Sequence, residues 1–210
     1  MTAESDAPAA LTFPPDLVPE LHGLILSNLP YEDLLRVKSV AKKWKALVES
    51  DPALQVLTFK KSSSTYRDNG VDSKVQRDSQ PMKMHPALQR MSWMLNQPAS
   101  EAEFYLHSQD NLSLASAGVL DDLATIPAIH TFLISLGYGG APIIVKSSKG
   151  ITVLDVLNGL VEAAEEPVDV GEDGEPIPMY EAMGDHIFYE GFSSLTRTGT
   201  KLFAMLDRGS

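Results

Sequence analysis

Residues that could carry out catalysis are few in this chain, and none falls into a complete catalytic motif. Gly191-Phe192-Ser193-Ser194-Leu195 begins like a nucleophile elbow, but leucine stands where that turn requires glycine. Gly137-Tyr138-Gly139-Gly140 lacks the lysine and the hydroxyl residue that follow in a phosphate-binding loop. Asp185-His186 could form an acid–base pair, although a local hydrogen-bonding turn is the simpler interpretation. The sequence therefore predicts no catalytic residue.

The residues that could bind a metal are equally scattered. The chain contains no cysteine, which excludes thiolate-bound zinc and a cysteine nucleophile. No pair of histidines has the His-x-x-x-His spacing of a helical zinc site, so a site assembled from His107, His130 and His186 is the remaining alternative. Residues 169–174 resemble a calcium-binding loop, but glycine occupies the third ligand position and Tyr180 the twelfth. We predict no metal and no cofactor, and expect a solvated acidic loop that can steer a basic partner.

Charge is distributed unevenly along the 210 residues, whose net charge is -11. Residues 1–90 hold 12 basic and 11 acidic residues, whereas residues 91–210 hold 5 basic and 17 acidic ones. This difference indicates two units with different surfaces. Because nucleic-acid binding needs clustered lysine and arginine, the acidic balance argues against a nucleic-acid partner. The basic residues between Arg36 and Lys45 are interpreted as a solvated helix face.

The N-terminal ten residues and the overall hydropathy bear on location. Met1 to Ala10 holds no basic residue and no apolar core of a secretory signal, so we expect a disordered tail there. No run of about 18 consecutive apolar residues occurs, which predicts that the chain does not insert into a membrane. We therefore expect an intracellular protein, cytoplasmic and/or nuclear.

Residues 11–59 have the spacing of short helices. Apolar residues recur at helical intervals in three stripes, and proline at position 30 separates the first from the second. The stripes are Leu21, Leu24, Ile25 and Leu29; then Leu34, Val37 and Ala41; then Val40, Trp44, Leu47 and Val48. Asp51-Pro52 is expected to end the run. The pattern predicts an all-helical unit of three helices.

The residue types in these helices resemble an F-box. The resemblance rests on four blocks in register: Leu17-Val18-Pro19-Glu20-Leu21, Ile25-Leu26-Ser27-Asn28-Leu29-Pro30, Asp33-Leu34-Leu35-Arg36-Val37 and Val40-Ala41-Lys42-Lys43-Trp44. Val18 replaces the usual proline and Ala41 the usual cysteine of the family, and both replacements are small and apolar. Gly23 within the first helix costs about 1 kcal/mol relative to alanine. These departures bear on affinity for a partner more than on identity.

The resemblance implies a substrate-recruiting subunit of an SCF-type cullin-RING ubiquitin ligase that binds a Skp-type adaptor, and through it cullin, and performs no chemistry itself. The candidates for the packed or adaptor-facing set are Leu17, Pro19, Leu21, Ile25, Leu29, Pro30, Leu34, Leu35, Val40 and Trp44. Leu29-Pro30 and Leu34-Leu35 are interpreted as a docking edge, whereas Leu24, Val37 and Leu47 are assigned to the core. Two alternatives stay open. The C-terminal unit could be an enzyme or small-ligand receptor whose turnover the F-box controls, or the F-box and adaptor could form a complex outside any ligase.

The remaining chain is predicted to comprise a flexible linker at 60–84 and an α+β domain at 85–210 that binds a protein substrate. Helices are expected at Pro86–Leu95 and Thr152–Glu166, and strands at Phe104–His107, Ile129–Leu136, Pro142–Lys146, Ile187–Tyr189 and Lys201–Leu206. Thr152 and Asp155 have the spacing of a capping box. The pieces 85–88 with Trp93, 151–157 and 184–192 weakly resemble a fungal domain of unknown function, which implies architecture and no activity.

Overall fold

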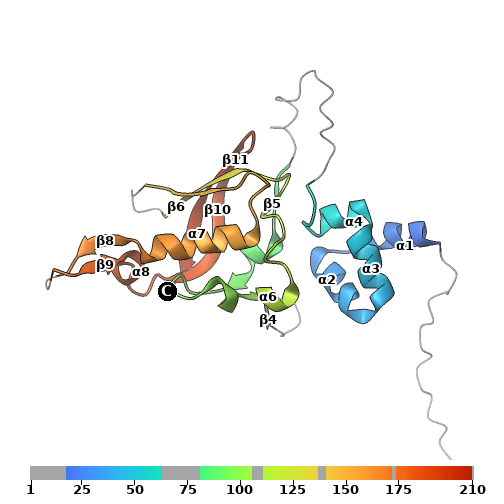
Figure 1. Ribbon diagram of the computed structural model, residues 1–210, viewed down its shortest axis with the longest axis horizontal. Coiled ribbons are helices and arrows are strands. Elements are labelled where there is room, and N and C mark those ends of the chain that lie inside the picture. The colour runs from blue at the N-terminus through green and yellow to red at the C-terminus, as the bar shows by residue number, and fades with distance from the viewer. Residues whose placement is uncertain (1–17, 63–80, 106–110, 137–140, 172–173, 210) are drawn as a thin grey trace, which may run out of the picture.

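The computed structural model in Figure 1 describes residues 18–62, 81–105, 111–136, 141–171 and 174–209. A bundle of short helices is followed along the chain by a larger region of strands and helices at 81–209. The prediction of a helical N-terminal unit followed by a mixed α+β region is thereby confirmed. The expected tail, most of the expected linker (63–80) and the turn at 137–140 lie outside the described residues.

The N-terminal bundle contains short helices, and all of them except α3 begin at or directly after proline. They are α1 (Pro19–Leu26), α2 (Tyr31–Val40), α3 (Lys42–Ser50) and α4 (Pro52–Leu57). Glu32 and Asp33 lie in the first turn of α2, where a carboxylate interacts favourably with the helix dipole. The bundle closes around its own small core, which consists of Leu26, Leu34, Val48 and Leu54.

Helix α4 replaces the predicted end of the bundle. Asp51-Pro52 was expected to stop the helices, yet the backbone N–H groups of Ala53 and Leu54 donate to Asp51 Oδ1 at 2.7 and 3.2 Å. Asp51 is thus an N-cap, and proline follows it at the first helical position, where its missing N–H costs nothing. The same dipeptide that ends α3 therefore starts α4.

The C-terminal region is built on a four-stranded sheet in the order β10-β11-β6-β7. Its strands are β6 (Thr131–Ser135), β7 (Ile143–Lys146), β10 (Phe188–Thr198) and β11 (Lys201–Gly209), of which β11 and β6 run parallel and the other neighbours antiparallel. Alternate residues of these strands, such as Phe132, Ile134, Leu202 and Ala204, are fully buried. They form one face of the main hydrophobic core.

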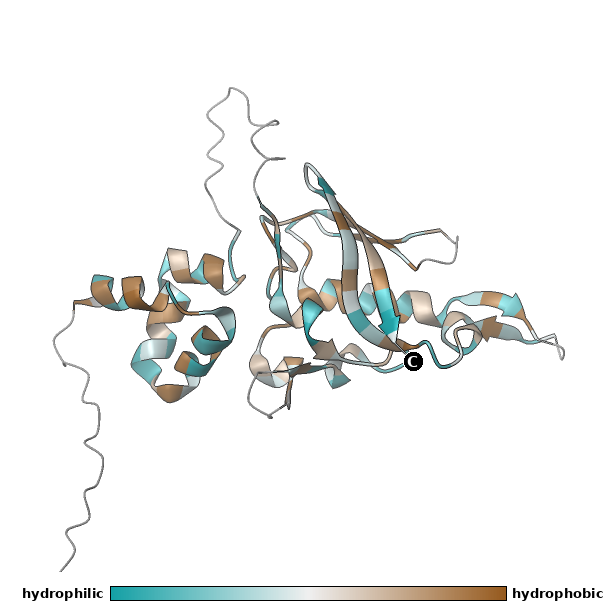
Figure 2. Cartoon of the chain, turned by 180° about the vertical axis from the view of Figure 1, so that it is seen from behind, coloured by the Kyte–Doolittle hydropathy of each residue, from teal (hydrophilic) through white to brown (hydrophobic). Residues whose placement is uncertain are grey.

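Helix α7 (Val153–Glu165) covers this buried face (Figure 1). The predicted capping box is present, because Thr152 Oγ1 accepts from the Asp155 N–H at 3.1 Å and Asp155 Oδ2 accepts from the Thr152 N–H at 2.9 Å. The predicted stripe of Val153, Leu157, Leu160 and Ala164 is buried. Figure 2, seen from behind, shows β10 and β11 in front of α7, so the other face of the sheet is turned outward.

Smaller elements surround this sheet and helix. Three strands form a second sheet: β2 (Met91–Ser92), β3 (Glu103–Tyr105) and β4 (Asn111–Ser113). Two pairs of strands are β1 (Lys83–Met84) with β5 (Thr125–Ile126), and β8 (Pro167–Val170) with β9 (Pro176–Pro178). The short helices are η1 (Pro86–Gln89), η2 (Ala99–Glu101), α6 (Leu114–Ala117) and α8 (Met179–Ala182). No helix in the described part of the chain is long and apolar enough to cross a bilayer.

Two predicted elements differ from the structure. The helix expected at Pro86–Leu95 is limited to the single turn of η1, because the next residues extend to pair Met91 with Phe104 in β2 and β3. The acidic stretch expected as a loop instead forms the hairpin β8–β9, in which Asp169 pairs with Ile177. In both segments, pairing with a neighbouring strand decides the conformation, and local residue preference does not reveal that neighbour.

Candidate functional site

Helix α1 exposes its apolar residues. The exposed fractions of Leu21, Leu24 and Ile25 are 43, 63 and 44%, and that of the preceding Val18 is 53%. Figure 2 shows α1 as a mostly hydrophobic helix at one end of the molecule. We call these four residues the α1 apolar face. Because a contiguous exposed apolar patch marks an interaction site, this face is the first candidate for partner binding.

The opposite side of α1 packs against the bundle. Leu26 and His22 are buried, and the His22 ring meets the Trp44 ring edge-on at a centroid distance of 4.9 Å. Gly23 lies against Asp51, since a Cβ added at position 23 would be 3.0 Å from Asp51 Oδ2. Leu24, which the sequence interpretation assigned to the core, instead lies on the exposed side. The helix thus turns Leu21, Leu24 and Ile25 outward and keeps His22 and Leu26 inside the bundle.

The other predicted adaptor-binding residues divide by exposure. Leu21, Ile25, Pro30 and Val40 are exposed; Leu29, Leu35 and Trp44 are half-buried; Leu34 is fully buried. Pro19 opens α1, and Leu17 lies outside the described residues. Leu34 belongs to the core of the bundle, and Leu35 packs against the main core of the C-terminal region. The pair Leu34-Leu35, interpreted above as a docking edge, therefore faces inward.

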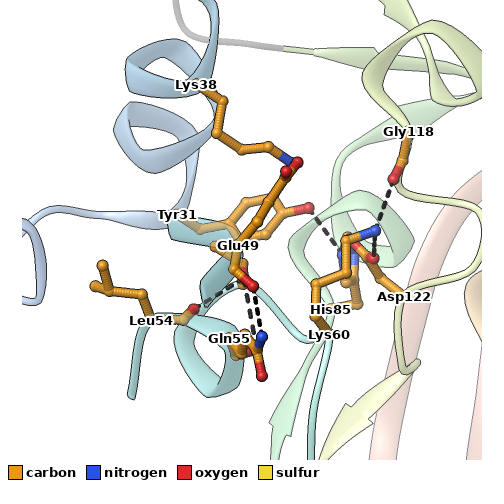
Figure 3. A network of polar contacts seen from close by, with 10 residues as sticks. Tyr31, Lys38, Glu49, Leu54, Gln55, Lys60, His85, Gly118 and Asp122 are labelled. Atoms are coloured by element: carbon orange, nitrogen blue, oxygen red, sulfur yellow. Dashed lines mark hydrogen bonds and ion pairs between the residues drawn. The ribbon is translucent and has the colours of Figure 1, made fainter. Parts of the chain in front are cut away.

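A second notable site lies where α2 meets the C-terminal region (Figure 3). Tyr31, the first residue of α2, is 8% exposed and belongs to the main core together with Phe59. The Tyr31 ring meets the rings of Phe59 and His85 edge-on, at centroid distances of 5.8 and 4.9 Å. Tyr31 Oη and His85 Nε2 are 2.9 Å apart. We call the contact region around these three rings the junction.

His85 is held in one tautomer at the junction. The Ala87 N–H donates to His85 Nδ1 at 3.1 Å, so the neutral ring carries its proton on Nε2, which donates to Tyr31 Oη. Burial lowers the pKa of His85, and the nearby Asp122 carboxylate, 3.6 Å from Nε2, only partly opposes this effect. Burial likewise raises the pKa of Tyr31 far above its usual value. Both rings are therefore neutral at physiological pH.

Two ion pairs accompany the ring contacts at the junction. Lys60 forms an ion pair with the buried Asp122 and donates to the carbonyl oxygen of Gly118 at 3.0 Å (Figure 3). Arg90 also donates to Glu32 of α2, at 2.5 Å. The junction thus joins the bundle to the C-terminal region through rings, hydrogen bonds and ion pairs together. Sequence reasoning missed this site because its members are far apart in the chain and fit no motif.

The side chains considered for catalysis and metal binding have ordinary structural surroundings. Ser193 lies within β10, and its hydroxyl donates to Asp207 Oδ1 at 2.6 Å. His186 Nε2 is 3.6 Å from Asp185 Oδ1, and both side chains are exposed. His107 and residues 172–173 of the acidic hairpin lie outside the described residues. Within the described ranges, no group of three potential metal ligands comes together.

Comparison with known families assigns the bundle. Residues 14–55 match the F-box domain, a range that runs from before α1 into α4. Neither the curated proteins nor the solved structures hold a match to the chain. F-box domains bind Skp-type adaptors, and chains that carry them serve SCF-type ubiquitin ligases as substrate adaptors. The helical bundle is therefore an F-box domain, and the chain is an F-box protein.

Proposed function

We propose that this protein recruits a protein substrate to an SCF-type cullin-RING ligase, with the α1 apolar face binding the Skp-type adaptor and the C-terminal region binding the substrate. The observation that carries the proposal is the outward stripe of Leu21, Leu24 and Ile25 in a domain that matches the F-box. Binding of a partner that removes such an exposed apolar face from water is favourable in free energy. Pro30 and Val40 are exposed as well and extend the candidate surface to both ends of α2.

The junction supports the recruiting role. Because Tyr31, Glu32 and Phe59 contact the C-terminal region directly, the F-box is packed against that region. A substrate bound to the C-terminal region would then be held at a defined place relative to the adaptor. Such a protein accelerates the transfer of ubiquitin to the substrate, because it raises the effective concentration of the substrate near the ubiquitin-carrying enzyme. No residue of this chain needs to act in the chemical step.

Co-purification with a Skp-type adaptor tests the adaptor-binding surface. The double variant Leu21→Asp/Ile25→Asp places two carboxylates on the α1 apolar face without touching the buried core. The matched control is Val168→Asp/Val170→Asp, which changes two exposed valines of the distant β8, 54 and 63% exposed. We expect the wild type and the control to retain the adaptor and the α1 variant to lose it. If the wild type fails to bind, or both double variants bind equally well, the proposal is wrong.

Recruitment of cullin separates a ligase from a two-protein complex. When wild-type protein and adaptor are mixed with a cullin–RING pair, the proposed function predicts one assembly that contains all components. An assembly that stops at the adaptor would support the alternative in which the F-box and its adaptor act outside a ligase.

A small-ligand receptor is the second candidate function, because one hollow in the C-terminal region has a suitable size and lining. Its volume is about 500 Å³, and mostly apolar residues line it, among them Met179 and Met183, together with His186 and Arg208. An amphipathic anion suits that combination, since its apolar part would meet the methionines and its charge the basic residues. Thermal unfolding with and without a medium-chain fatty acid tests this alternative, which predicts a concentration-dependent rise in Tm.

A further inference from the structure

Two strands of the C-terminal region that lie on either side of β2, namely β3 and β10, present the same kinds of side chain outward. In β3, Glu103 and Tyr105 flank the buried Phe104 and are both exposed. In β10, Phe188 and Glu190 flank the buried Tyr189 in the same way. The exposed fractions of Tyr105 and Phe188 are 47 and 44%. Each strand therefore offers one aromatic ring and one carboxylate on its outer face, two residues apart.

The backbone connects these two strands through β2 and the residues that follow it. Ser92 of β2 pairs with Glu103 of β3, and the chain just after β2 is bound to the start of β10. The Tyr189 N–H donates to the carbonyl oxygen of Trp93 at 2.9 Å, and Met94 forms a bridge with Phe188. The small sheet and β10 are thus joined through ordinary strand hydrogen bonds.

Between them the surface is hollowed. One hollow of about 480 Å³ is lined by Glu101, Glu103 and Phe188, and a second of about 430 Å³ is lined by Tyr105, Phe188 and Glu190. Phe188 and Ser92 belong to both, so the two hollows adjoin. We call the two hollows together the aromatic–acidic groove. Exposed aromatic residues in a concave surface are the side chains that most often dominate binding energy.

The charged residues that line the groove have a single sign. None of the residues that line the two hollows is lysine, arginine or histidine, whereas three are glutamate. The part of the chain from Met91 onward carries 17 acidic and 5 basic residues. The local and the regional charge therefore favour the same partner, a basic one. A bound metal ion is not favoured, because the described residues hold no group of three potential metal ligands.

We infer that the aromatic–acidic groove binds an extended, basic segment of the substrate, in which arginine or lysine alternates with apolar residues. The cationic side chains meet Glu101, Glu103 and Glu190 and lie on the rings of Tyr105 and Phe188, which attract cations through their faces. The apolar residues cover the remaining ring surface. In naming the segment as part of a substrate, the inference rests on the proposed function; the binding itself does not.

Fluorescence anisotropy on the full chain tests the inference. The probe is a short labelled peptide of alternating arginine and leucine, compared with the same peptide carrying glutamate in place of arginine. We expect the arginine peptide to bind, with an affinity that falls as salt rises, and the glutamate peptide not to bind. The variant Phe188→Ala/Glu190→Gln should weaken binding of the arginine peptide by about tenfold or more.

A matched control removes the same chemistry from another surface. Phe203→Ala/Glu162→Gln also deletes one exposed ring, 42% accessible on β11, and one exposed carboxylate, on α7. It should bind the peptide within about twofold of the wild type, since net charge alone has a modest effect at physiological salt. Tyr105→Ala/Glu101→Gln is a second groove variant, to be used if circular dichroism shows that the first one is unfolded. Absence of binding to the wild type, equal weakening by groove and control variants, or equal binding of the glutamate peptide would each overturn the inference.

Adaptor binding provides an independent readout for the proposed function. Phe188→Ala/Glu190→Gln should still co-purify with the Skp-type adaptor, and Leu21→Asp/Ile25→Asp should still bind the arginine peptide. A wild-type protein that binds the adaptor but not the peptide overturns the groove alone. One that binds the peptide but not the adaptor overturns the proposed function and leaves the groove intact.

Discussion

Tyr31 Oη accepts a hydrogen bond from His85 Nε2 at 2.9 Å across 54 residues of sequence, and this bond joins the first residue of an F-box helix to the core of the C-terminal region. The bond is buried, and the rings around it pack edge-on. The F-box is therefore packed against the C-terminal region and is not connected to it by the chain alone. Its second helix completes a core that it shares with the region proposed to hold the substrate.

Tyr31→Phe should destabilise the protein while preserving its shape. The variant keeps the ring but removes the acceptor that lies 2.9 Å from His85 Nε2, which leaves the Nε2–H only the more distant Asp122 carboxylate at 3.6 Å and costs about 1 kcal/mol. Urea unfolding should report this loss. Tyr180→Phe is the control, because its hydroxyl bonds to the exposed Glu181 carboxylate, and its effect should stay within about 0.5 kcal/mol. Equal effects of the two variants would show that the junction bond contributes nothing special.

Stability should fall in mild acid because of His85. Burial lowers the pKa of His85 in the folded protein below its ordinary 6.5, so the unfolded chain binds the proton more readily than the folded one. The contribution of neutral His85 is therefore fully present above about pH 6.5 and is lost as the pH falls from there toward the lower folded pKa. The slope from this one group is at most about 1.4 kcal/mol per pH unit.

Two histidine variants isolate that contribution from the carboxylates. His85→Asn removes the titrating ring, so its unfolding free energy, measured from pH 8 to 5, should fall less steeply than that of the wild type. His186→Asn removes an exposed histidine and should reproduce the wild-type slope. If the His85 variant loses as much stability in acid as the wild type does, the buried neutral ring is not the cause.

Alanine variants of Leu34 and Leu24 should distinguish a residue that stabilises the F-box from one that binds the adaptor. Leu34→Ala opens a cavity in the core of the F-box, where the side chain is fully buried, and should lower the free energy of unfolding by about 2 to 5 kcal/mol. Leu24→Ala shortens a side chain that is 63% exposed and should change stability by less than about 0.5 kcal/mol. Titration with the Skp-type adaptor should nevertheless show weaker binding of Leu24→Ala. An unchanged affinity would remove Leu24 from the docking surface.

This pair also shows how far the sequence could be interpreted. The F-box was predictable because its residue types occur in consecutive blocks, and α7 was predictable because its cap and its stripe are local. Leu24 and Leu34 are both leucines at helical spacing, so their opposite exposure depends on how α1 and α2 lie against α3. The junction and the aromatic–acidic groove combine residues from distant segments. The alternation of Phe188 and Glu190 is visible in the sequence, but the strand beside it is not.

Gly159→Ala should destabilise the protein although it improves helix propensity. Gly159 lies in the middle of α7, where alanine would stabilise an isolated helix by about 1 kcal/mol. An added Cβ, however, would lie 2.6 Å from Val145 Cγ2, and that methyl group is held in place by a buried, β-branched side chain on β7. The overlap costs about 1 to 3 kcal/mol, so the net effect should be a loss measurable by urea unfolding.

In a protein that also carries Val145→Ala, the effect of Gly159→Ala on the free energy of unfolding should change sign. With that methyl group removed, the added Cβ at position 159 has room, and Gly159→Ala should then be neutral or stabilising by up to about 1 kcal/mol. The difference between the two backgrounds measures the contact between helix and sheet directly. A stabilising Gly159→Ala in the wild-type background would mean that α7 does not approach β7 this closely, and the packing of α7 on the sheet would have to be revised.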